Sequence, residues 1–233
     1  MPTALWAPPA VIIALWINSA RKSAVTTTDA INALETIVAE TNSAISLVAE
    51  LGTELSGGQV ARLGLSAPDP VSVGLPIPGD PAGVPATILS QIEASAGVVA
   101  LDREHLLVQH REIGWQIIAT PHAIVHQDLN FAKTQLTSAI ALAANFLSQS
   151  DLVGDHSKIS ESLQKFRTLH LPPNLNQKHV ESLELAARVH IVATGAIADS
   201  EAVASPSQDR MRVQVLRNLE RDCLQLLQAG AIC

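Results

Sequence analysis

Residues 5–17 read Leu-Trp-Ala-Pro-Pro-Ala-Val-Ile-Ile-Ala-Leu-Trp-Ile, a run that contains no charged side chain. Pro8 and Pro9 suit the first turn of a helix, because a backbone N–H at that position has no helical partner to lose. Arg21 and Lys22 follow the run and match the negative end of a helix dipole. This stretch therefore predicts a helix that reaches about Arg21 and is buried in the core of the protein.

Neither a membrane span nor a secretory signal fits this segment. A helix needs roughly 20 apolar residues to cross a bilayer, and the run from Ala4 to Ile17 is shorter. A signal peptide carries its cations before the apolar part, whereas Arg21 and Lys22 come after it. We expect a soluble protein without a membrane span.

The composition excludes several classes of protein. The 233 residues are 47% hydrophobic and 16% charged, which favours a folded core over disorder. A net charge of −7 and an aromatic content of 3% argue against nucleic-acid binding, which uses positive charge or aromatic platforms. Cys223 and Cys233 form neither a zinc-binding pattern nor a disulfide framework, so we expect a reducing, cytoplasmic environment.

Three sections of the chain differ in pattern. Residues 1–52 predict a helical hairpin, with capping side chains for its second helix among Thr27, Thr28 and Asp29. The next section, to residue 125, is rich in proline and glycine and predicts a small sheet of four or five strands. Residues 126–233 predict four antiparallel helices. The predicted fold is α+β and predominantly helical, with domains 1–125 and 126–233 that could also form one continuous domain.

The predicted elements have approximate boundaries. Strands are expected at residues 60–65, 71–77, 97–101, 105–109 and 115–119, and a short helix at 86–95. The C-terminal bundle is expected to consist of helices at 128–149, 157–169, 177–204 and 207–228.

The stretch Leu55-Ser56-Gly57-Gly58-Gln59 spells the signature of ATP-binding-cassette ATPases, which places a helix N-terminus against a γ-phosphate. That signature acts beside a phosphate loop of the form GxxxxGK[ST], and the chain contains no such string. The residues after it alternate as in a strand. We therefore interpret the segment as a glycine turn and predict no ATP binding and no other cofactor.

Histidine is frequent between residues 105 and 126, where four of the eight histidines occur. Together with nearby carboxylates they could supply the three or four converging ligands that a metal site needs. The candidate ligands are His105, His122, His126 and Asp128. The alternative is a set of surface histidines, because Pro121 favours extended chain and would separate His122 from His126.

Two features of the predicted C-terminal helices could carry other functions. Arg210, Arg217 and Arg221 form one stripe of the last helix, which could contact an anion or a partner protein, or could simply face solvent. His190 falls on an apolar stripe and is predicted to be a histidine at the edge of the core, since no proton-accepting partner is apparent.

A resemblance rests on three features of the sequence. They are the segment Leu75-Pro76-Ile77-Pro78-Gly79-Asp80-Pro81-Ala82-Gly83, the strand ending at Trp115-Gln116-Ile117-Ile118, and Leu171-Pro172-Pro173 between two helices. In these features the chain resembles an uncharacterised protein family of high-GC Gram-positive bacteria. It differs in having fewer alanines and arginines in its C-terminal helices. No activity is known for that family, so the resemblance implies an architecture and no site.

Two hypotheses for function follow. The absence of catalytic motifs and the wide apolar faces of the predicted helices favour a non-catalytic interaction protein that forms a homo-oligomer or binds another protein. The alternative is a metal-dependent hydrolytic enzyme that uses the histidines and carboxylates of residues 102–128.

Overall fold

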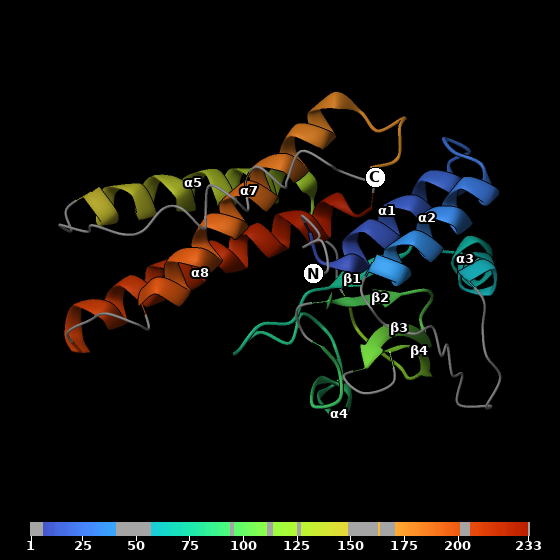
Figure 1. The fold of residues 1–233 in the computed structure, drawn as a ribbon, viewed down its shortest axis with the longest axis horizontal. Coiled ribbons are helices and arrows are strands. Elements are labelled where there is room, and N and C mark those ends of the chain that lie inside the picture. The colour runs from blue at the N-terminus through green and yellow to red at the C-terminus, as the bar shows by residue number, and fades with distance from the viewer. Residues whose placement is uncertain are drawn as a thin grey trace.

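The computed structural model describes residues 7–40, 57–93, 96–110, 114–124, 127–148, 163, 171–200 and 206–232. Its helices are α1 (Pro9–Arg21), α2 (Thr27–Glu40), α3 (Gly57–Ser66), α4 (Ala86–Leu89), α5 (Leu129–Ser148), α7 (Gln177–Ser200) and α8 (Pro206–Gly230). Its strands are β1 (Ser72–Gly74), β2 (Val98–Ala100), β3 (His105–His110) and β4 (Gly114–Ala119). The fold is α+β and predominantly helical, as predicted (Figure 1).

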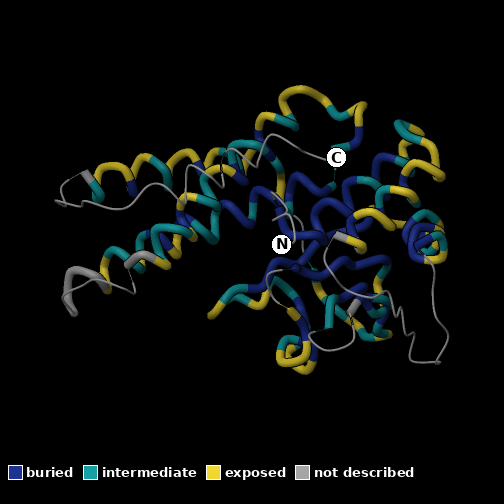
Figure 2. The backbone as a smooth tube through the Cα atoms, viewed as in Figure 1, coloured by how far each residue is buried: buried dark blue, intermediate teal, exposed yellow. Residues whose placement is uncertain are grey.

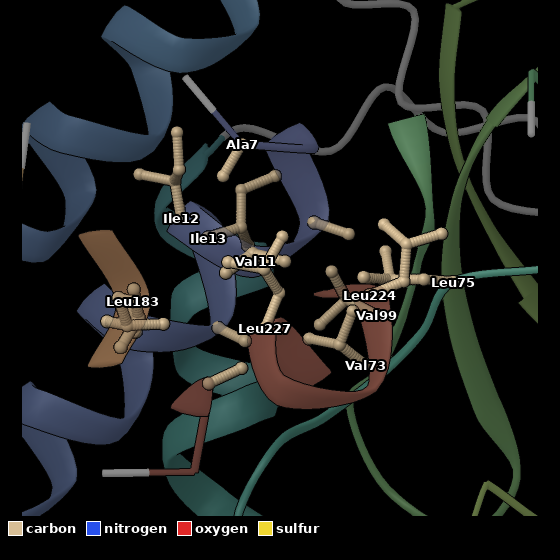
Figure 3. Packing of buried hydrophobic residues seen from close by; sticks show 14 of the residues in the cluster. Ala7, Val11, Ile12, Ile13, Val73, Leu75, Val99, Leu183, Leu224 and Leu227 are labelled. Atoms are coloured by element: carbon tan, nitrogen blue, oxygen red, sulfur yellow. The ribbon is translucent and has the colours of Figure 1, made fainter. Parts of the chain in front are cut away.

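Helix α1 forms the centre of the core. Every residue from Ala10 to Leu15 is completely buried, and so is Ile17. In Figure 3, Val11 of α1 faces Leu227 of α8, and Leu224, which also belongs to α8, lies beside Val73 and Val99 of the sheet. The apolar run is therefore covered on all sides by protein, as the sequence predicted. In the part of the chain that the structure describes, no helix has the length and apolar character to cross a membrane.

Asn18 is a polar side chain inside this core, with only 2% of its surface exposed. Its Nδ2 donates hydrogen bonds to the carbonyl oxygens of Val71 and Ala231, each over 2.8 Å. Its Oδ1 accepts one from the backbone N–H of Val71 over 3.0 Å. One amide therefore joins α1 to the segment before β1 and to the end of α8, and it satisfies three buried backbone groups.

The sheet is a four-stranded antiparallel meander in the order β1-β2-β3-β4. Its register aligns Val73, Val99, Leu107 and Ile117 in one row across the strands, and this row belongs to the main core. Alternate residues point to the opposite face, where Val98, Leu106 and Val108 pack with Ile88 of α4 and Ile92. Both faces of the sheet are thus covered, one by the main core around α1 and the other by the proline-rich connection.

The prediction of a strand at residues 60–65 is wrong, because this segment lies within helix α3. The glycine turn predicted at residues 55–59 is wrong as well where the structure describes it, because Gly57 begins the same helix. The residues that it buries are Gly57, Val60, Ala61 and Gly64, which share one face at helical spacing. Three of them are small, so the helix approaches α1 closely: a Cβ at position 64 would lie 2.9 Å from Cγ2 of Ile17. An apolar alternation of only six residues fits a short helix as well as a strand.

Arg21 holds the C-terminal end of α3 in place. Its Nη1 donates to the carbonyl oxygens of Gly64 and Ala67, each over 2.7 Å. These carbonyls belong to the last turn of a helix and just beyond it, where helical partners run out. Arg21 therefore acts as a capping side chain for α3 in addition to lying in the last turn of its own helix.

The residue that caps α2 is Thr26, which lies one residue before the predicted group Thr27, Thr28 and Asp29. Thr26 Oγ1 accepts a hydrogen bond from the N–H of Asp29 over 3.1 Å, and the Asp29 carboxylate accepts one from the N–H of Thr26. This reciprocal pair satisfies two backbone donors at the helix N-terminus.

The three described C-terminal helices are arranged around α8, which contacts both α5 and α7. They extend away from the sheet and the N-terminal hairpin in Figure 1, and their surface in Figure 2 is largely exposed or half-buried toward the far end. The predicted helix at 157–169 lies outside the described residues apart from residue 163. The predicted domain boundary at residue 125 stays a prediction, and Asn18 forms hydrogen bonds with segments on both sides of it.

We predict that Asn18→Ala lowers the free energy of unfolding by about 3 kcal/mol, because it leaves the three bonded backbone groups without partners inside the core. Chemical denaturation measures this value. Asn32→Ala is the matched control, since Asn32 is exposed on α2, and its effect should stay within about 0.5 kcal/mol. Equal effects of the two variants would contradict the role of Asn18.

We also predict that Gly64→Ala destabilises the protein by about 1–2 kcal/mol. On an open helix the same change would stabilise by up to about 1 kcal/mol through helix propensity, so the sign of the effect is informative. The new methyl group would meet two fully buried side chains, Ile17 and Val71. Arg62→Ala, on an exposed position of the same helix, serves as the control, and a gain in stability for Gly64→Ala would show that α3 does not pack against α1.

Candidate functional site

His105 and Asp102 form the closest histidine–carboxylate pair among the predicted metal ligands and their neighbours. Nδ1 of His105 lies 2.8 Å from Oδ2 of Asp102, in the turn that joins β2 to β3. Asp102 Oδ1 also accepts the backbone N–H groups of Glu104 and His105, over 2.8 and 2.7 Å. The carboxylate thus organises a tight turn, which is a common structural role for aspartate.

The pKa of the Asp102 carboxyl reflects these hydrogen bonds. Burial acts to raise its pKa, but the hydrogen bonds from the Glu104 amide, the His105 ring and the His105 amide outweigh burial and lower the pKa below its ordinary value of 3.8. Asp102 is therefore ionised at neutral pH and is not suited to act as a general acid there.

His122 lies beside the same region but makes a different contact. Its Nδ1 lies 3.1 Å from the carbonyl oxygen of Thr120, to which it can donate a hydrogen bond. His122, Asp102 and Arg103 line one open cavity of about 310 Å³ next to the start of β1. The structure thus brings His122, a predicted metal ligand, to the same surface cavity as Asp102, the carboxylate that pairs with His105.

Asp128 has a structural contact of its own. Its Oδ1 accepts the backbone N–H of Phe131 over 3.0 Å, which makes it the capping residue of α5. His126 lies outside the described residues. Within the described ranges, no three His, Cys, Asp or Glu side chains converge into a group that could hold a metal ion. The metal site stays a prediction that elemental analysis of the purified protein can test.

His190 has a partner that the sequence analysis did not identify. Its Nε2 lies 3.8 Å from Oε1 of Glu220, which connects α7 to α8, and both side chains are largely buried. Burial lowers the pKa of His190 and raises the pKa of Glu220, so each group is shifted toward its neutral form. The contact depends on how the two helices pair, and residue spacing within either helix carries no signal for it.

Cys223 does not supply a nucleophile. The side chain is completely buried between helices, and burial together with Asp222 and Glu220 raises the pKa of the thiol far above its ordinary value. A thiol in this setting is not ionised at physiological pH and behaves as a small apolar side chain.

The three arginines of the predicted stripe have different surroundings. Arg210 and Arg217 are exposed on α8, and their contact with an anion or a partner protein stays a prediction. Arg221 is half-buried where α8 meets the proline-rich loop, and its Nε is shielded from solvent without a hydrogen-bond partner. Arg221 lines a cavity that neither Arg210 nor Arg217 reaches.

This cavity, which we call the loop pocket, has a volume of about 270 Å³. The polar side chains that line it are Asp80, Gln127, Arg221, Gln225 and Gln228. Asp80 belongs to the proline-rich loop, Gln127 follows β4, and the other three belong to α8. No local pattern in the sequence connects this loop with Arg221, because the two are far apart along the chain.

A second surface feature lies on the C-terminal helices. The exposed large hydrophobic side chains of the described residues are Phe131 (55%), Leu142 (71%), Val192 (39%) and Met211 (62%). All of them belong to α5, α7 or α8. The N-terminal helices and the sheet contribute none within the described ranges, so exposed apolar surface is concentrated in one part of the molecule.

We predict that Asp102→Ala lowers the free energy of unfolding by about 1–2 kcal/mol at pH 7, because it removes charge-assisted hydrogen bonds in the turn. The sign of the pH effect follows from the lowered pKa: the stabilisation is complete above about pH 4 and is lost as the pH falls through the folded-state pKa. Denaturation curves from pH 7 to pH 2 should show the two proteins converging, and a constant difference would contradict this assignment.

Comparisons with known proteins concern the C-terminal helices. A family model described as Rv1486c-like protein, C-terminal domain, matches residues 131–225, which is less than half of the chain. Neither curated proteins nor solved structures gave a significant match. The match runs from α5 through most of α8 and does not include the segment 75–83 that carried the resemblance noted above. In its C-terminal helices, the chain is thus similar to an uncharacterised family that is named after a mycobacterial protein.

Proposed function

We propose that the protein is a self-associating module in which the outer surface of α5 contacts α5 of a second copy. The observation that carries this proposal is that, among the described residues, the exposed large hydrophobic side chains all lie on the three C-terminal helices, with Leu142 the most exposed of them. Apolar surface that a single chain leaves uncovered is a common mark of a protein–protein contact.

The face of α5 has the chemistry of a helix-docking surface. Phe131 and Leu142 are eleven residues apart, which places them on one face, about three helical turns from each other. Lys133 is the only charged residue between Leu129 and Ser148. Little electrostatic free energy is therefore lost when water leaves this face.

Three hydroxyl-bearing residues on the exposed side of α5 already form hydrogen bonds within the helix. The hydroxyl groups of Thr134, Thr137 and Ser138 donate to the carbonyl oxygens four residues earlier, over distances of 2.8–3.0 Å. A second helix that covered these residues would not leave their hydroxyl donors without partners. Their short side chains also allow close approach of another backbone.

The lack of charge on this face allows a second copy of this chain to occupy it. The chain carries a net charge of −7, so two copies repel each other over most of their surface. An uncharged helix face is where two such copies can meet with the least repulsion. A twofold arrangement would place the same face on both sides, as in most homodimers.

The test is the mass in solution, measured by light scattering across a range of micromolar concentrations. We expect a species of about twice the chain mass of 24.6 kDa for the unmodified protein. Leu142→Glu should shift the equilibrium toward the monomer by at least about tenfold in dissociation constant, because it places a charge at the centre of the contact.

Ala39→Glu is the matched control, since it adds the same charge at an exposed position of α2 and should leave the dimer intact. A monomeric mass for the unmodified protein at every concentration would refute self-association. Equal effects of Leu142→Glu and Ala39→Glu would place the contact elsewhere and would refute the role of α5.

A further inference from the structure

The loop pocket combines residues from three distant parts of the sequence. The proline-rich loop after β1, the segment after β4 and the C-terminal half of α8 each contribute to its lining. Its polar groups are one guanidinium, one carboxylate and three carboxamides, from Arg221, Asp80 and three glutamines. A pocket with these groups offers donors and acceptors of both charges within a small volume.

The two charged groups in the pocket do not neutralise each other by direct contact. No ion pair joins Arg221 to Asp80 among the described residues, although both line the same cavity. Nε of Arg221 is shielded from solvent and has no hydrogen-bond partner. A ligand in the cavity does not reach this closed N–H, but an anionic group there would pair with the other guanidinium N–H groups of Arg221, which form no ion pair with an acidic side chain among the described residues.

The backbone of the loop holds Asp80 in a fixed position. The N–H and C=O groups of Ile77 and Asp80 bond reciprocally over 2.9 Å, around a turn in which Gly79 has φ +87°. Asp80 Oδ1 accepts the N–H of Ala82 over 3.0 Å, so this carboxylate is oriented by the turn and retains Oδ2 for another donor.

Gly83 allows the loop to reach the other wall of the pocket. It has φ +78°, and a Cβ at this position would collide with the carbonyl group of Ala123. Only glycine fits at this position without displacing the segment after β4. On the third wall, Nε2 of Gln228 donates to the carbonyl oxygen of Val73 over 3.2 Å, which leaves its amide oxygen as an acceptor.

We infer that the loop pocket binds a small zwitterion of the amino-acid class, with its carboxylate on Arg221 and its ammonium group on Asp80. Arginine presents several N–H donors in one plane, which suits a carboxylate. The Asp80 carboxylate and the carboxamide oxygens suit the three donors of an ammonium group. A ligand that carries both charges satisfies both ends of the site, whereas a singly charged ligand leaves one end without a partner. This binding activity is independent of the self-association proposed above.

The experiment is isothermal titration of the full chain with glycine, β-alanine, 4-aminobutyrate and the twenty common amino acids. The first three differ in the distance between their charges, so they reveal the spacing that the pocket accepts. Propionate and propylamine carry one charge each and serve as ligand controls. We expect at least one zwitterion to bind at least about tenfold more tightly than either control.

Two variants connect the binding to the pocket. Arg221→Gln and Asp80→Asn should each weaken the best zwitterion by at least about tenfold, because each removes one charged partner. Arg217→Gln is the matched control on the same helix, since Arg217 is exposed and does not line the pocket. Circular dichroism shows whether each variant is folded. If one of them is not, Gln225→Leu, which removes another polar group of the pocket, is used in its place and should also weaken binding.

The inference is overturned if no zwitterion binds at millimolar concentration. It is also overturned if propionate or propylamine binds as tightly as the best zwitterion, since one charge would then suffice. Unchanged binding in a folded Arg221→Gln protein would show that the ligand lies elsewhere, and this result would overturn the inference as well.

Discussion

The buried amide of Asn18 is the constraint on which the rest of the structure depends. An unpaired amide in the core would destabilise the fold, so its three hydrogen bonds must all form. Those bonds require the segment before β1 and the end of α8 to reach α1 together. The position of α8 in turn sets where Arg221 lies relative to the proline-rich loop, and where α5 and α7 pack. The loop pocket and the outer face of α5 are both consequences of how α8 is anchored.

The sequence was sufficient to predict the elements that rest on local periodicity. The helix ending at Arg21, strands β2 to β4 and helices α5, α7 and α8 were predicted close to their observed bounds, because burial on one face imposes a period of 3.6 or 2 residues. Strand β1 and helix α4 are shorter than the predicted ranges 71–77 and 86–95. The segment at 60–65 was mistaken for a strand because its small residues hid the helical stripe. The roles of Asn18 and Arg21 depend on partners more than 40 residues away, and no local pattern carries that information.

The same distinction applies to the candidate sites. The histidine-rich segment was found from residue types alone, and the structure pairs His105 with the Asp102 carboxylate in a turn while Asp128 caps a helix. Arg221 was predicted to belong to a stripe of equivalent arginines, because spacing on one helix does not distinguish its two ends. The difference arises in three dimensions, where only one end of α8 meets the proline-rich loop.

The bond between Asn18 and Ala231 spans 213 residues of sequence. During synthesis α1 leaves the ribosome long before Ala231, a partner of the Asn18 side chain, has been added to the chain. Until then the apolar surface of α1 is not covered by α8. Contacts of such separation also slow folding, because a long loop has to close before they form. The helix with the longest fully buried run among the described residues is therefore exposed until the end of α8 has been synthesised, and during that time its apolar surface is open to aggregation and to chaperone binding.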